Sequence, residues 1–203
     1  MNNKKTIAIL GSGGHSKVIH EIAVLNGYQQ ILYFDDNIKD QNVIGRSGDL
    51  ILMSDKIFDL FIAIGDNNLR KKKYEELNKY FNMVSLIHPK SIVSSSTIVK
   101  NGSVIMAGSV INPDVIIGVC SIINTGSVID HECFIDNFVH ISPGVKIGGQ
   151  VKIGELSWVG IGSSIINNIN IGSNVIIGAS SLIINDIDSN FKYAGIPAKK
   201  MLI

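Results

Sequence analysis

Residues 104–129 read VIMAGSVINPDVIIGVCSIINTGSVI, and this stretch shows the pattern that decides the fold. Every sixth residue from Val93 to Ile183 is Ile or Val, sixteen in succession. An α-helix repeats its faces every 3.6 residues and an ordinary strand repeats every two, so neither produces a period of six. Hexapeptide periodicity is typical of a parallel β-helix.

The repeat predicts a prism in which each hexapeptide supplies one short strand and one turn. Three hexapeptides then make a coil of about eighteen residues, and sixteen make roughly five coils. The recurring Ile or Val points inward and stacks on its counterpart in the next coil. Four residues after each of these lies a second file, mostly Ser or aliphatic, as at Ser103, Ser109 and Val115. Because each coil buries its core only against its neighbours, both ends of the prism need caps.

Composition and charge exclude several kinds of partner. The chain has 203 residues, with 18 Lys and Arg against 17 Asp and Glu, so no net field attracts nucleic acid or an anionic membrane. The basic run Lys71 to Lys73 is interpreted as a solvated helix face. No apolar run is long enough to span a membrane, and residues 1–6 do not begin a signal peptide.

Two further expectations concern the compartment and the assembly. The cysteines, Cys120 and Cys133, both lie in the repeat and suit reduced thiols better than a disulfide. We therefore expect a cytoplasmic protein. The repeat is poor in charge and rich in Ile and Val, which predicts self-association with closed symmetry.

Before the repeat, the predicted order of elements is strand, helix, strand, strand, helix, strand. The strands are residues 5–10, 30–34, 58–64 and 83–87, and the helices run to about residue 26 and from 69 to 81. This succession predicts a small parallel α/β domain over residues 1–88, followed by the repeat domain over 89–203. Three polar clusters, at 11–17, 35–36 and 65–70, lie at the carboxyl ends of the strands, where ligands of such sheets bind.

The first polar cluster is a glycine-rich turn between a strand and a helix. Gly11, Gly13 and Gly14 let backbone N–H groups approach an anion at the helix N-terminus. Asp35 follows about twenty residues later in the sequence, where the acid of the dinucleotide fingerprint accepts ribose hydroxyls. However, Ser16 stands where that fingerprint has its last Gly. A nucleotide diphosphate without nicotinamide therefore fits better than a nicotinamide-dependent oxidoreductase. A turn that only tightens strand–helix packing is the remaining alternative.

One turn of the repeat carries titratable side chains, Asp130, His131 and Glu132, and His140 follows nine residues after His131. A histidine beside a carboxylate is suited to act as a general base, because the acid holds the imidazole and raises its proton affinity. A polar turn residue without a catalytic role is the alternative for His131. Zinc carbonic anhydrases share the prism architecture, but their ligand spacing differs from that of His131 and His140, so we expect no metal.

Five segments together resemble one protein family. They are GSGGH (11–15), Asp35-Asp36, IAIGDNNLR (62–70), HEC (131–133) with His140, and AGIPAK (194–199). The family comprises bacterial sugar acetyltransferases of the PglD/NeuD type, which are nucleotide-linked amino-sugar N-acetyltransferases and sialic acid O-acetyltransferases. The resemblance covers nearly the whole chain, whereas the repeat alone is shared by the wider hexapeptide-repeat acyltransferase superfamily.

The resemblance implies a Rossmann-like domain followed by a left-handed parallel β-helix, assembled as a homotrimer. It implies that acetyl-CoA lies along the prism between neighbouring subunits and that the nucleotide sugar binds the amino-terminal domain. His131 matches the catalytic base and Glu132 the acid that supports it. The matches to cofactor contacts are His140, Gly149, Ile161 and Ala179, and those to nucleotide-sugar contacts are Ser12, Gly13, Gly14, His15, Asp35, Asp36 and Gly65.

The function that follows from the resemblance is acetyl transfer to the 4-amino group of a UDP-linked 4-amino-4,6-dideoxy sugar in glycan or glycoprotein-sugar biosynthesis. The acceptor amine must lose a proton before or during attack, which gives His131 its task. Two alternatives stay open. One is O-acetylation of sialic acid or another sugar, and the other is a non-catalytic hexapeptide scaffold.

Overall fold

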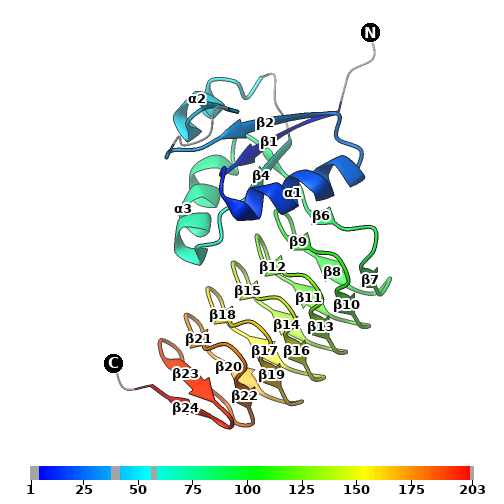
Figure 1. The fold of residues 1–203 in the computed structure, drawn as a ribbon, viewed down its shortest axis with the longest axis vertical. Helices are drawn as coiled ribbons and strands as arrows, with labels where there is room; N and C mark the ends of the chain where they lie inside the picture. The colour runs from blue at the N-terminus through cyan, green and yellow to red at the C-terminus, as the bar shows by residue number, and fades with distance from the viewer. Residues whose placement is uncertain (1–4, 38–41, 56–58, 202–203) are drawn as a thin grey trace. The chain divides into compact units, whose positions relative to one another are not determined.

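The computed structural model describes residues 5–37, 42–55 and 59–201. The chain divides into two compact units, Met1–Pro89 and Lys90–Ile203 (Figure 1). Each unit has its own hydrophobic core. None of the helices within these described ranges combines the length and the apolarity needed to cross a bilayer.

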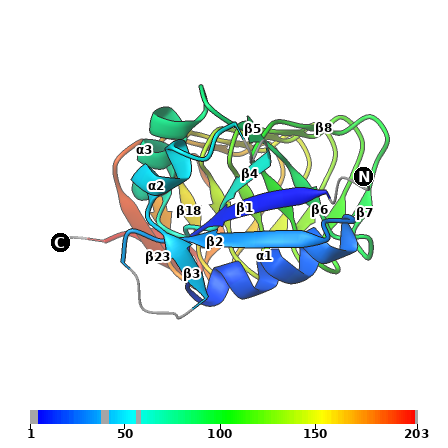
Figure 2. The ribbon, with the colours of Figure 1, turned by 90° about the horizontal axis from the view of Figure 1, so that it is seen from above.

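The amino-terminal unit is a parallel sheet with helices on both sides. Its strands are β1 (Thr6–Leu10), β2 (Gln30–Phe34), β3 (Val43–Gly45), β4 (Asp59–Ile62) and β5 (Asn82–Met83), and its helices are α1 (Gly14–Leu25), α2 (Ser47–Ile51) and α3 (Asn67–Leu77). The strand order is β3-β2-β1-β4-β5. Figure 2 shows α1 on one side of this sheet and α2 and α3 on the other. The order reverses at β1, so the carboxyl ends of β1, β2 and β4 meet where ligands of such sheets bind.

The apolar run of β1 is explained by burial on both faces of the sheet. Ala8 and Leu10 pack in the core on the side of α2 and α3, together with Leu50 and Leu77. The alternate residues of the strand, such as Ile9, are fully buried as well. A central strand of a covered parallel sheet therefore reads as continuously hydrophobic instead of alternating.

Several predicted boundaries in this unit need correction, and two short elements were not predicted. The predicted strand 83–87 is two pieces: β5 ends the sheet, and β6 (Leu86–Ile87) is not among the five strands of this sheet. Met83 and Leu86 are buried three residues apart, which breaks the alternation of a strand. Helix α3 begins at Asn67, capped by the Asp66 side chain, and it ends at Leu77 instead of residue 81. Strand β3 and helix α2 went unpredicted because they are short.

The third predicted strand covered residues 58–64, of which residue 58 lies outside the described ranges, and β4 ends at Ile62.

The carboxy-terminal unit is a stack of short strands joined by turns (Figure 1), and each strand of the repeat has two residues. The strands are β7 (Ile92–Val93), β8 (Ile98–Val99), β9 (Val104–Ile105), β10 (Val110–Ile111), β11 (Ile116–Ile117), β12 (Ile122–Ile123), β13 (Val128–Ile129), β14 (Phe134–Ile135), β15 (His140–Ile141), β16 (Lys146–Ile147), β17 (Lys152–Ile153), β18 (Trp158–Val159), β19 (Ser164–Ile165), β20 (Asn170–Ile171), β21 (Ile176–Ile177) and β22 (Leu182–Ile183). Each pairs in parallel with the strand eighteen residues away, as Val110 pairs with Val128 and Ile122 with His140. The predicted eighteen-residue coil is confirmed.

The coils give the prism three faces. One sheet contains β7, β10, β13, β16, β19 and β22, the second contains β8, β11, β14, β17 and β20, and the third contains β9, β12, β15, β18 and β21. The third sheet continues into β23 (Lys192–Gly195), which pairs with β21, and β24 (Ala198–Lys200), which pairs antiparallel with β23. The repeat predicted that this end of the prism needs a cap. The hairpin is a cap on the last coil.

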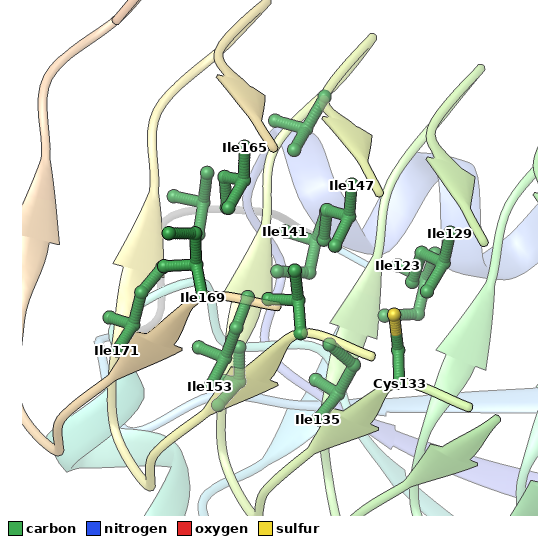
Figure 3. Packing of buried hydrophobic residues seen from close by; sticks show 14 of the residues in the cluster. Ile123, Ile129, Cys133, Ile135, Ile141, Ile147, Ile153, Ile165, Ile169 and Ile171 are labelled. Atoms are coloured by element: carbon green, nitrogen blue, oxygen red, sulfur yellow. The ribbon is translucent and has the colours of Figure 1, made fainter. Parts of the chain in front are cut away.

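The interior of the prism has two kinds of ladder. Inward aliphatic residues such as Ile129, Ile147 and Ile165 stack coil on coil (Figure 3), and those at positions 105 to 183 in steps of six are at most 3% exposed. Buried serines of the second file tie the coils together. The Oγ of Ser121, for example, donates to the O of Asp136 at 2.7 Å and accepts from the N–H of Val139 at 3.1 Å. These hydroxyls satisfy polar groups that burial would otherwise leave unpaired.

One turn position in each hexapeptide has a left-handed backbone. From residue 102 to residue 180, in steps of six, φ lies between 50° and 74°. Glycine occupies five of these positions, and the others carry side chains at a cost of about 1 kcal/mol each. Glu132, Gln150 and Asn168 hold this position in successive coils at one corner of the prism. Backbone bonds from Gln150 N to His131 O (2.9 Å) and from Asn168 N to Gly149 O (2.9 Å) hold the turns together.

Candidate active site

The turn after β13 brings His131 and Glu132 into contact. The Nδ1 atom of His131 lies 3.0 Å from Oε2 of Glu132, and both side chains are about half exposed. With its proton on Nδ1, the imidazole donates to the carboxylate and keeps the lone pair of Nε2 available as a base. The two predicted catalytic residues are therefore adjacent in a geometry that suits proton abstraction.

Residues of the neighbouring coils hold this turn. The side chain of Asn112 donates to Oδ1 of Asp130 at 2.7 Å, and the same oxygen accepts the backbone N–H of His131 at 2.8 Å. These two hydrogen bonds lower the pKa of Asp130 and keep it a carboxylate, and the bond from Asn112 has the larger effect. On the other side, Nε2 of Gln150 donates to Oε2 of Glu132 at 3.1 Å. Asn112 and Gln150 had no role in the sequence prediction.

A cavity of about 470 Å³ opens beside the imidazole. Its lining consists of Asp130, His131, Gly148, Gly149, Gln150, Ile166, Asn167 and Asn168. A Cβ atom on Gly149 would lie 2.7 Å from Cε1 and Nε2 of His131, so the ring rests on the glycine. The predicted cofactor contact Gly149 thus shares a cavity with the predicted base.

Cys133, next in the chain, is unsuited to act as a nucleophile. Its Sγ is buried and lies 3.1 Å from the O of Gly148. Burial raises the pKa of its thiol to about 11, so the thiolate is scarce at neutral pH. No group of three or more His, Cys, Asp or Glu side chains within the described ranges is placed to hold a metal ion.

The other predicted cofactor contacts form a second group. His140, Ile161 and Ala179 line a cavity of about 390 Å³ on the outer face of β15, β18 and β21. The indole of Trp158 stacks on the His140 ring, with centroids 5.5 Å apart and planes 3° from parallel. The Nε1 of Trp158 donates to Oγ of Ser142 at 2.8 Å. The result is an apolar groove with an aromatic floor.

Within one chain, these two groups lie on different parts of the prism. His131 is in the turn between β13 and β14, which belong to two of the three sheets, whereas His140 is on β15 in the third. Their two cavities have no lining residue in common. A single chain therefore does not bring His131 and His140 into one pocket.

In the amino-terminal unit, the strand ends form a cavity of about 500 Å³. It is lined by Leu10, Gly11, Ser12, Gly13, Asp35, Asp36, Asn37, Ala63, Ile64, Leu69 and Lys73. Oδ2 of Asp35 accepts the N–H of Ser12 at 2.7 Å and its hydroxyl at 2.6 Å. These two hydrogen bonds hold the glycine-rich turn in place. A Cβ atom added to Gly13 or Gly14 would meet no other atom within 4 Å. The turn thus leaves its backbone accessible to an anion.

Several structures of known acetyltransferases superpose on this chain. Residues 6–77 match the family described as the PglD N-terminal domain. A histidine variant of perosamine N-acetyltransferase from Caulobacter crescentus, solved with CoA and GDP-perosamine, is 33% identical, with a TM-score of 0.95 over 98% of this chain and 97% of that chain. The acetyltransferase domain of PglB from Neisseria gonorrhoeae, solved with acetyl coenzyme A, is 36% identical, with a TM-score of 0.92 over 98% of this chain and 100% of that chain. This chain belongs to the PglD/NeuD family of bacterial sugar acetyltransferases.

The same comparisons confirm the predicted fold class, a Rossmann-like domain followed by a left-handed parallel β-helix, and the predicted enzyme class, an acetyltransferase. WeeI from Acinetobacter baumannii is 20% identical, with a TM-score of 0.89 over 97% of this chain and 99% of that chain, and that similarity shows the fold alone.

Of the family positions predicted to contact the nucleotide sugar, Ser12, Gly13, Asp35 and Asp36 line the cavity at the strand ends, whereas Gly14, His15 and Gly65 are not among its lining residues. His15 is half-buried, and its Nε2 has no hydrogen-bond partner among the described residues. Burial and the nearby Arg70 guanidinium lower the pKa of His15 to about 4. Gly65 accepts a hydrogen bond from Nη1 of Arg70 at 3.0 Å.

Lys73 corrects the interpretation of the basic run as a solvated face. Its side chain is 12% exposed, and its Nζ lies 2.7 Å from Oδ2 of Asp36 and 2.9 Å from Oε2 of Glu76. Oδ1 of Asp36 accepts the N–H and hydroxyl of Ser47. Burial alone would raise the pKa of Asp36, but the hydrogen bonds from Lys73 and Ser47 outweigh it and lower the pKa to about 2. The ion pair therefore forms one wall of the cavity.

Proposed function

We propose that this acetyltransferase moves the acetyl group of acetyl-CoA to the 4-amino group of a UDP-linked 4-amino-4,6-dideoxy sugar, in the biosynthesis of surface glycans or glycoprotein sugars. The observation that carries the proposal is the arrangement of His131, Glu132 and Gly149. An imidazole oriented by a carboxylate and placed beside an open cavity is what deprotonation of an amine acceptor requires.

The reaction we assign is direct transfer. Nε2 of His131 takes a proton from the acceptor amine as its nitrogen bonds to the thioester carbon. The oxyanion of the tetrahedral intermediate needs N–H donors, and we assign the backbone near Gly149 to this task. The carbon–sulfur bond then breaks, and the coenzyme A thiolate takes the proton held by the imidazolium. Glu132 stabilises that imidazolium between the two steps.

The acceptor's nucleotide is assigned to the cavity at the strand ends. Backbone N–H groups at Gly13 and Gly14, where α1 begins, suit a diphosphate. The paired acids Asp35 and Asp36 support a uridine nucleotide. A GDP-linked amino sugar is the second candidate, because perosamine N-acetyltransferase, 33% identical to this chain, was solved with GDP-perosamine.

The assembly we propose is a homotrimer with active sites between subunits. The separation of the His131 and His140 groups within one chain supports it, since a neighbouring copy is then needed to bring a coenzyme A groove to the base. We place the enzyme in the cytoplasm, where acetyl-CoA and nucleotide sugars are available.

The experiment that tests the function measures coenzyme A release with a thiol reagent. Acetyl-CoA is held constant against a panel of UDP-linked 4-amino sugars, GDP-linked 4-amino sugars and sialic acid. Release with one UDP-linked amino sugar alone supports the proposal in full. Release with a GDP-linked sugar changes the nucleotide but not the reaction, and release with sialic acid moves the enzyme to O-acetylation. Absence of release across the panel favours a scaffold.

A further inference from the structure

We infer that Gln150 is a positioning residue for the base, an inference that rests on the proposed role of His131. The Nε2 of Gln150 donates to Oε2 of Glu132 at 3.1 Å, and that same oxygen lies 3.0 Å from Nδ1 of His131. The carboxylate is therefore held from two sides. One contact orients the imidazole, and the other holds the carboxylate that orients it.

The repeat explains why this contact forms. Glu132 and Gln150 occupy the left-handed turn position in adjacent coils, so their side chains leave the backbone side by side. The N–H of Gln150 also donates to the O of His131 at 2.9 Å, which fixes the distance between the two turns. Gln150 is thus coupled to the catalytic turn through its backbone and its side chain.

The contact matters because the side chain of Glu132 is 53% exposed. An exposed carboxylate with a single partner can change rotamer and release the imidazole. Hydrogen bonds to charged groups are strong, so the amide of Gln150 favours the rotamer that faces His131. That rotamer keeps the proton of the neutral imidazole on Nδ1 and leaves the Nε2 lone pair for the acceptor amine.

The side chains around this turn determine how a substitution at Gln150 alters the charge near the His131 imidazole. Asp114 lies in the preceding coil, Asp130 and Glu132 flank His131, and Gln150 contributes a neutral donor from the following coil. Replacing that donor with a carboxylate adds negative charge near the imidazole, whereas replacing it with glycine leaves the charge unchanged.

Two variants test whether Gln150 acts through its N–H donor or only through the space that its side chain fills. Gln150→Gly removes the amide at a turn position where five other hexapeptides already have glycine, so the backbone tolerates it. Gln150→Glu keeps the shape of the side chain but removes the N–H donor. Asn174→Gly is the matched control, since it removes an amide from the same turn position at another corner of the prism.

We expect Gln150→Gly to lower kcat about tenfold, with the KM of both substrates within about twofold of the parent. Gln150→Glu lowers kcat at least as much. It also moves the acid limb of the pH–kcat profile to higher pH, because added negative charge stabilises the imidazolium. Asn174→Gly keeps the parent kcat. Parent activity in either Gln150 variant overturns the inference.

Measuring His131→Ala alongside separates this inference from the proposed function. If His131→Ala is active, the assignment of His131 as the base is wrong. If His131→Ala is inactive and Gln150→Gly is fully active, only the role inferred for Gln150 is wrong. The acceptor in these assays is a UDP-linked 4-amino-4,6-dideoxy sugar.

A measurement on the free protein decides the case if turnover is absent. Long-range ¹H–¹⁵N NMR distinguishes the two neutral tautomers of His131, whose signals are assigned by their loss in His131→Ala. The parent shows the proton on Nδ1, and Gln150→Gly shifts the population toward Nε2–H. An unchanged tautomer ratio contradicts the positioning role.

Discussion

The His131 imidazole lies against the Cα atom of Gly149, so close that a Cβ there would be 2.7 Å from Nε2 and Cε1 of the ring. The φ angle of Gly149 is not in the left-handed region, so glycine is needed at this position for space and not for backbone freedom. The next coil thus supplies the floor on which the base rests.

Gly149→Ala should displace the imidazole and lower kcat by about 10- to 100-fold, because small errors in the position of a catalytic group are costly. The test is a double-mutant cycle with His131→Ala. If Gly149 acts through His131, then adding Gly149→Ala to His131→Ala changes nothing further. A larger KM for acetyl-CoA in both backgrounds would instead identify Gly149 as a cofactor contact alone.

His131→Ala should lower turnover by about 10²–10⁴-fold and leave assembly intact, because it removes a general base from a half-exposed turn. Steady-state coenzyme A release measures the first effect, and size-exclusion chromatography measures the second. His20→Ala is the control. The His20 imidazole is hydrogen-bonded to the Tyr33 hydroxyl within the amino-terminal unit, so its loss should not change kcat. Equal turnover in His131→Ala and the parent would end the assignment.

Inactive variants of His131 and His140 should complement each other if the active site is shared between subunits. In trimers formed at random by coexpression of His131→Ala and His140→Ala, about one quarter of the sites combine both intact residues. We therefore expect activity near that fraction of the parent, well above the activity of either variant expressed alone. No gain over the single variants would place both histidines in the same subunit's site.

Trp158 should report coenzyme A binding through its fluorescence, because it is the only tryptophan of the chain and is 46% exposed in the groove with His140. Coenzyme A that occupies the groove covers the indole, and the emission should shift to shorter wavelength with a saturable dependence on concentration. UDP, assigned to the other unit, should leave the emission unchanged. An emission spectrum that is insensitive to saturating acetyl-CoA would remove this groove from the cofactor site.

Lys73→Met should flatten the pH dependence of stability at acid pH. The pKa of Asp36 is lowered to about 2 in the folded protein, against the ordinary value of 3.8 for an aspartate side chain. The ion pair therefore contributes stability above about pH 4, and this contribution is lost as the pH falls toward 2. Thermal melts between pH 2 and 5 measure the slope. Lys72→Met, at an exposed neighbouring position, should retain the parent slope, and an equal slope in Lys73→Met would contradict the coupling.

The prism was predictable because its signal is repeated. A single hexapeptide such as Ile153 to Trp158 would be ambiguous, but sixteen in register leave one architecture that buries every sixth residue. The α/β unit was predicted less well where its elements are shortest. Strand β3 has three residues and α2 has five, too few to show a period.

The candidate site divides in the same way. His131 and Glu132 are neighbours in sequence, so their contact followed from the sequence itself. Gln150 and Trp158 escaped prediction because their partners, Glu132 and His140, lie eighteen residues earlier in the chain. The missed signal was available: at a coil spacing of eighteen, Gln150 follows Glu132 and Trp158 follows His140. Lys73 meets Asp36 only through the packing of α3 beside the sheet, which no spacing predicts.

The eighteen-residue register also acts as a phase along the chain. An insertion of one whole coil after Asn174 would lengthen the prism and leave every downstream side chain on its own face. An insertion of six residues at the same point would turn everything beyond it by one face, about 120°. The hairpin formed by β23 and β24 would then begin on a different sheet. The prism can therefore gain or lose residues only in multiples of three hexapeptides if every later strand is to stay on its own sheet.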